Sequence, residues 1–149
     1  MLEPISHPRP EETPRTQAYF GGFTSHPGLK ETRKYMRGDC GHMALALHSL
    51  MPSSQIWSVG DGHFATEGAD GYFWDIRGRM SMAQLWSGLS GAHMTPVSRE
   101  DLIKELDSGV YKSGFYSESQ ERAAARLIKT LCPHLHAKPA PKGLPPPKA

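Results

Sequence analysis

Residues 38–50 read GDCGHMALALHSL, and this stretch dominates the expected fold because it joins a helix start to an apolar helical pattern. Asp39 is a natural N-cap residue, and Pro52 cannot continue a helix. The apolar residues that recur at helical spacing are Met43, Leu47, Leu50 and Met51. We therefore expect an amphipathic helix over residues 39–51, with Cys40 in its first turn.

Short strand patterns follow this helix, and further helices follow the strands. Residues 55–59, 63–66 and 72–76 form strand-length runs of apolar and aromatic side chains, separated by turns rich in Gly and Asp. The serines that begin later helical patterns are Ser81, Ser98 and Ser117. Two of these serines are followed three residues later by Gln, which is the spacing of a capping box. The order of elements predicts an α+β domain in which the first helix packs on a small antiparallel sheet, with additional helices toward the C-terminus.

The composition suggests one core domain with unpacked ends. Residues 1–18 contain repeated prolines and few apolar side chains, and residues 133–149 are rich in Pro and Lys, so both segments are expected to be disordered. Residues 19–132 are then one domain of ordinary size. The low hydrophobic fraction, 38% of 149 residues, agrees with this division.

Charge and composition exclude several classes of protein. A formal net charge of +2 is too small to indicate nucleic-acid binding. The sequence has neither an apolar run of membrane-spanning length nor a secretory signal, so a cytoplasmic protein is expected, with Cys40 and Cys132 as free thiols. The run Cys132–His136 offers three metal-type ligands without regular spacing, and neither a metal site nor a cofactor is expected.

Cys40 is the first candidate for chemistry. Unpaired backbone N–H groups and the helix dipole at a helix start favour a thiolate, which is the nucleophilic form of cysteine. Gly38 and Gly41 are expected to leave room for a substrate beside the sulfur. The alternative is a buried cysteine that serves only as a small apolar side chain.

His63 and Asp75 complete a possible catalytic set. Asp is disfavoured in strands, so an Asp within the run 72–76 should have a compensating partner, and the N–H of His63 is a candidate. The alternatives are an Asp75 that faces solvent or pairs with Arg77 or Arg79. His42, close to Cys40 on the helix, is a rival base, although adjacent helix positions point in different directions.

The loop between the two strands tests this pairing, because side chains alternate between the faces of a sheet. A two-residue turn at residues 70–71 would put His63 and Asp75 on opposite faces. A three-residue loop over residues 69–71, ending in a left-handed glycine, would make them diagonal neighbours on one face. A five-residue loop over residues 67–71 would set them directly opposite. The pairing therefore requires an odd loop.

The order of these residues resembles that of the papain-like and transglutaminase-like superfamily. More narrowly, GDCGHMALALHSL followed by HFATEGADGYFWDIRG (residues 63–78) is similar to small uncharacterised proteins of bacteria, phages and plasmids. The resemblance implies a papain-like α+β core in which Cys40 is the nucleophile, His63 the general base and Asp75 the residue that orients His63. It further implies acyl transfer with the backbone N–H of Cys40 as an oxyanion donor.

Two functions follow as expectations. The first is a thiol-dependent hydrolase or acyl transferase that acts on an amide, peptide or isopeptide carbonyl of a protein or peptide substrate. The second is a non-catalytic interaction protein of a phage or mobile element, with the same fold and a host-takeover or anti-defence role. The Pro-rich ends favour the second, as does the absence of any Gln between Gln17 and Cys40, where papain-type enzymes carry an oxyanion-hole Gln.

Overall fold

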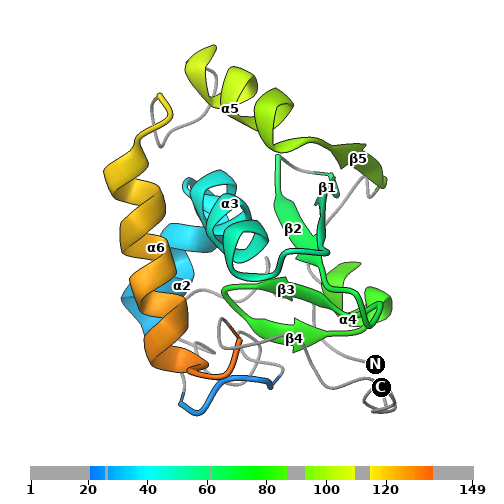
Figure 1. Cartoon of the computed structure of the whole chain (residues 1–149), viewed down its shortest axis with the longest axis vertical. Helices are drawn as coiled ribbons and strands as arrows, with labels where there is room; N and C mark the ends of the chain where they lie inside the picture. The colour runs from blue at the N-terminus through cyan, green and yellow to red at the C-terminus, as the bar shows by residue number, and fades with distance from the viewer. Residues whose placement is uncertain (1–20, 26, 61, 87–92, 110–114, 136–149) are drawn as a thin grey trace.

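Figure 1 shows a computed structural model, which describes residues 21–25, 27–60, 62–86, 93–109 and 115–135. The expected disordered segments, residues 1–18 and most of 133–149, lie outside this part of the chain. No helix within the described ranges combines the length and apolar character needed to cross a membrane.

The described elements form an α+β fold, as predicted. Their order along the chain is α2 (Leu29–Arg37), α3 (Cys40–Leu50), β1 (Gln55–Ser58), β2 (Phe64–Glu67), β3 (Phe73–Asp75), β4 (Gly78–Met80), α4 (Met82–Trp86), β5 (Thr95–Val97), α5 (Arg99–Asp107) and α6 (Glu118–Leu131). The strands pair antiparallel in one five-stranded sheet of order β4-β3-β2-β1-β5. The helix that carries Cys40 packs on this sheet, and the described helices α4, α5 and α6 follow it toward the C-terminus, as expected.

Helix α3 lies at the centre of the molecule, between the sheet and α6 (Figure 1). Every residue from Cys40 to Leu47 is buried. The prediction of an amphipathic helix is therefore wrong for most of its length, because α6 covers the side that a two-layer fold would leave to solvent. One face of α3 joins a cluster with α6 and Trp74 of β3, and another joins a cluster with Phe64 of β2 and α5.

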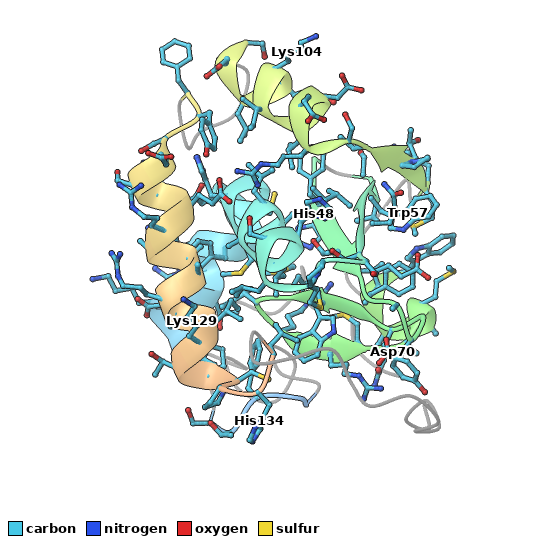
Figure 2. All side chains as sticks on the ribbon, viewed as in Figure 1. His48, Trp57, Asp70, Lys104, Lys129 and His134 are labelled. Carbon is cyan, nitrogen blue, oxygen red and sulfur yellow. The ribbon has the colours of Figure 1, made fainter. Side chains whose placement is uncertain are left out.

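The helix starts predicted at Ser81, Ser98 and Ser117 are confirmed, but the capping box at Ser117 forms only one of its two bonds, because the backbone N–H of Ser117 donates to His42 instead of Gln120. Ser98 accepts a hydrogen bond from the backbone of Asp101, and Ser117 accepts one from the backbone of Gln120. At α4, Ser81 and Gln84 form both bonds of a capping box. Figure 2 shows Lys104 of α5 and Lys129 of α6 on the outer side of the molecule, as expected for the polar faces of these capped helices.

Three described elements were not predicted. Helix α2 contains the basic residues Lys30, Arg33 and Lys34, which are exposed, and it buries Thr32 and Tyr35 on the other side. Strands β4 and β5 have three residues each, too few to show a period. β5 also contains a proline, which is tolerated because β5 is an edge strand.

Candidate active site

Cys40 opens helix α3, where the sequence placed it, and its side chain is only 7% exposed. Its thiol donates a hydrogen bond to the carbonyl oxygen of Gly62, at 3.2 Å. The expectation that Gly41 leaves room for a substrate is wrong: Gly41 is buried, and a Cβ atom there would lie 2.9 Å from a methyl group of Leu106. Glycine at this position lets α5 pack closely against the start of α3.

The loop between β2 and β3 has the odd length that the site requires. Thr66 pairs with Trp74, and the backbone N–H of Gly68 donates to the carbonyl of Tyr72 at 2.9 Å. Three residues therefore form the loop, and its last residue, Gly71, has a φ of 86°. Of the three loop lengths that the sequence left open, the structure has the three-residue loop that ends in a left-handed glycine, which meets the requirement for an odd length.

His63 and Asp75 meet across this pair of strands. Nε2 of His63 lies 2.9 Å from Oδ2 of Asp75, and both side chains are 2% exposed. Burial lowers the pKa of His63, but the hydrogen bond with Asp75, the nearby sulfur of Cys40 and the charges of these two groups outweigh burial and raise the pKa to about 9. The surroundings of His63 therefore favour its imidazolium form.

The remaining ring nitrogen of His63 is available to Cys40. Among the described residues, Nδ1 is buried without a hydrogen-bond partner, because the resting thiol is directed at Gly62. The thiol lies close to the ring, because its hydrogen-bond acceptor, Gly62, immediately precedes His63 in the chain. Since Nε2 is bound by Asp75, Nδ1 is the atom that can exchange a proton with the sulfur.

Asp75 has a second partner that the sequence offered only as an alternative. The guanidinium of Arg77 donates to both of its carboxylate oxygens, at 2.7–3.1 Å, and the backbone N–H of Arg77 donates to Oδ1 at 2.7 Å. Burial raises the pKa of Asp75, but the charge of Arg77 and the bond with His63 hold it well below its usual range. Asp75 therefore binds His63 and Arg77 at once, as a carboxylate.

His42 is not the base for Cys40. It is fully buried, its Nδ1 donates to Asp39 at 2.5 Å, and its Nε2 accepts from the backbone N–H of Ser117 at 3.0 Å. Both ring nitrogens are thus occupied. Asp39 is correspondingly not the side-chain N-cap that the sequence predicted, since it binds His42 instead. The pair joins the start of α3 to the start of α6, and the ring of Tyr116 stacks on His42.

Cys132 provides a contrasting thiol. It is 8% exposed and ends α6, and burial raises its pKa more than backbone hydrogen bonds from His134 and Leu135 lower it. Within the described ranges, which stop before His136, no group of three His, Cys, Asp or Glu side chains is placed to hold a metal ion. Cys132 is therefore the natural internal control for the reactivity of Cys40.

Comparisons with protein-family models, curated proteins and solved structures found no match to this chain. The arrangement of Cys40, His63 and Asp75 is thus the observation from which a function has to be inferred. Arg77 is the part of the site that the sequence did not assign. The signal was its position two residues after Asp75: residues 76–77 form the turn between β3 and β4, and from this turn the guanidinium reaches back to the carboxylate.

Proposed function

We propose that the chain is a thiol-dependent hydrolase or acyl transferase that acts on an amide, peptide or isopeptide carbonyl, with a papain-like or transglutaminase-like core. The observation that carries this proposal is the buried imidazole of His63, which is held through Nε2 by Asp75 and has Nδ1 left for Cys40. A nucleophile, a base within reach of it and a group that orients the base are the parts that thiol catalysis needs.

The reactive form of the site is the thiolate of Cys40 beside the imidazolium of His63, with the proton of the thiol held on Nδ1 of the ring. The thiolate then attacks the carbonyl carbon, and the carbonyl oxygen becomes an oxyanion near the helix start, where the backbone N–H of Cys40 has no intrahelical acceptor. His63 gives its proton to the departing amine as the carbon–nitrogen bond breaks, which leaves a thioester on Cys40.

The second half of the reaction resolves the thioester. His63, now neutral, takes a proton from a water molecule or an incoming amine as that molecule attacks the thioester carbon. The carbon–sulfur bond breaks, and a carboxylic acid or a new amide is released. The sulfur leaves as the thiolate beside the imidazolium, so the starting charge pair is restored. Asp75 stays ionised throughout and orients the ring.

The pH dependence of alkylation tests the nucleophile. Cys40 is expected to react with iodoacetamide at least 10 times faster than Cys132 at pH 6.5, because it faces an imidazolium and Cys132 does not. The modified residue is identified by mass mapping, and the variants Cys40→Ala and Cys132→Ala show which thiol each rate belongs to. Equal rates at the two cysteines in the folded protein would overturn the proposal.

The low exposure of Cys40 favours a second candidate, a non-catalytic interaction protein of a phage or mobile element with the same fold. In that case the Cys40–Gly62 hydrogen bond is structural. The variant Cys40→Ala separates the two candidates. An interaction protein keeps its biological effect after this change, whereas a thiol enzyme loses it while its far-UV circular dichroism and melting temperature stay unchanged.

A further inference from the structure

Arg77 is an unusual residue to find at the centre of a small domain. Its side chain is 0% exposed. Besides its bonds to Asp75, its Nη2 donates to the carbonyl oxygen of Leu85, in α4, at 3.1 Å. A buried guanidinium is costly unless a negative charge and several acceptors compensate it. The carboxylate of Asp75 supplies that charge, so the two residues form one buried ion pair behind His63.

We propose that Arg77 is a positioning residue of the thiol site: it fixes Asp75 against His63 and supplies the positive charge that balances Asp75. This inference rests on the proposed function, and it adds a fourth member to the set. With Arg77 present, two cations and two anions alternate along the line Arg77, Asp75, His63 and Cys40 when the thiol proton is on the imidazole. Because Arg77 balances the charge of Asp75, the positive charge of the imidazolium can stabilise the thiolate of Cys40.

Other charged groups near the site are paired among themselves. On the element that carries Cys40, Asp39 binds His42, and the Nζ of Lys34 lies 3.9 Å from Asp39. On β4, next to Arg77 in the chain, Arg79 pairs with Asp70 at 3.2 Å, and both side chains are partly exposed. Among the described residues, Arg77 is thus the guanidinium that contacts Asp75.

The direction of its effect follows from charge alone. Removing a nearby positive charge raises the proton affinity of every neighbouring group. A lysine at position 77 would keep the charge but lose the planar fork that matches a carboxylate. Loss of charge and loss of geometry can therefore be separated with Arg77→Gln and Arg77→Lys. Arg79→Gln is the matched control, since it removes a guanidinium from the neighbouring strand without touching Asp75.

The test measures two midpoints against pH: the rate of Cys40 alkylation by iodoacetamide, and the imidazole chemical shifts of His63. In Arg77→Gln both midpoints are expected to rise by about one pH unit or more. Arg77→Lys should move them by less than half as much, and Arg79→Gln should leave them in place. If Arg77→Gln does not fold, the midpoints of Asp75→Asn are compared with those of the double variant Asp75→Asn/Arg77→Gln. The double variant has no uncompensated charge at this pair, and its midpoints should be the higher ones.

The outcomes distinguish this inference from the proposed function. A folded Arg77→Gln variant with unmoved or lowered midpoints overturns the assignment of Arg77. Equal shifts in Arg77→Gln and Arg79→Gln overturn it as well, since the effect would not pass through Asp75. A wild-type Cys40 that reacts no faster than Cys132 overturns the thiol enzyme instead, and the His63 midpoint then still decides the role of Arg77.

Discussion

Nε2 of His63 lies 2.9 Å from Oδ2 of Asp75, although the two residues are 12 apart in the sequence and lie on different strands of a pair, at the end away from the loop. The bond exists because the loop between them has three residues and returns the chain with Asp75 on the same face as His63. It sets the charge on the imidazole and, through it, the chemistry available to Cys40. Most of the predictions below concern this bond or the residues that hold it.

Replacing Asp75 by Asn should lower the pKa of His63 from about 9 by about two units, because burial then acts without the carboxylate that opposes it. The amide oxygen of Asn can still accept the ring N–H, so the change tests charge more than geometry. Imidazole chemical shifts followed from pH 4 to 10 measure it. Asp70→Asn, which alters an exposed carboxylate of the loop, is the control. A midpoint that stays near 9 in Asp75→Asn contradicts the described electrostatics.

The stability of the protein should decline above neutral pH. The pKa of His63 is raised from 6.5 to about 9, so the stabilisation it provides is complete below pH 6.5 and is lost as the pH rises through 9. By linkage this amounts to about 3 kcal/mol at most. Asp75 acts in the opposite sense: its pKa is lowered from 3.8, so its contribution is present above pH 3.8 and is lost as the pH falls further.

Urea unfolding at pH 5.5, 7.5 and 9.5 measures this decline. The free energy of unfolding should be highest at pH 5.5 and lowest at pH 9.5 within this set. His63→Gln should remove most of the difference, since Gln does not titrate. Equal stabilities of the wild type at pH 5.5 and 9.5 would mean that His63 is not held as a cation in the folded protein.

The loop parity can be tested by changing its length. Deleting Ala69 should leave a two-residue turn and send Asp75 to the other face of the sheet, so the raised pKa of His63 should disappear and the melting temperature should fall sharply. Gly71→Ala keeps the length. Nothing lies within 4 Å of a Cβ atom at Gly71, so it should cost only the backbone strain of a positive φ, about 1 kcal/mol. If both variants lose the same stability and both retain the His63 pKa, the register is not what positions Asp75.

Much of this fold could be predicted because its signals are local. The caps at Ser81, Ser98 and Ser117 are set by residues three positions apart, and each serine accepts the backbone bond that the spacing indicated, although the reciprocal Gln bond forms at Ser81 and not at Ser117. The parity rule for the β2–β3 loop followed from the alternation of side chains along a strand. By this rule, the pairing of His63 with Asp75 depends only on whether the loop has an odd number of residues. The sequence left the loop length open, and the structure has three residues in the loop.

The parts that the sequence did not give depend on distant packing. His42 was a rival base in the sequence, but it is buried and its Nε2 is occupied, because the start of α6, 75 residues further on, closes over it. Likewise, Gly41 was expected to make room for a substrate, and it makes room for α5 instead. Whether Arg77 faces solvent or Asp75 could not be decided from the sequence, because Arg77 lies in the turn between β3 and β4 and its second acceptor is the Leu85 carbonyl of α4.

Gly41→Ala should test the contact between α3 and α5 beside the nucleophile. An added methyl group would lie 2.9 Å from Leu106, which is 1% exposed and has little room to move. We expect a loss of about 1–3 kcal/mol from this overpacking. Shortening the obstructing side chain with Leu106→Ala should make Gly41→Ala less costly, and urea unfolding of the four proteins of this cycle measures the coupling. Strictly additive losses would show that the two helices do not meet at this point.

The buried ion pair behind His63 predicts strong coupling between two other substitutions. Arg77→Gln leaves Asp75 without its main counter-charge, and Asp75→Asn leaves Arg77 buried without one, so each should cost about 3–5 kcal/mol. The double variant buries neither charge alone and should be more stable than the sum of the single losses predicts, by about 2 kcal/mol or more. Urea unfolding at pH 6, where His63 is protonated in the wild type, measures all four proteins. If the double variant loses as much free energy of unfolding as the two single variants together, the two residues act independently. Arg77 would then contribute to the site only through packing and its bond to the Leu85 carbonyl.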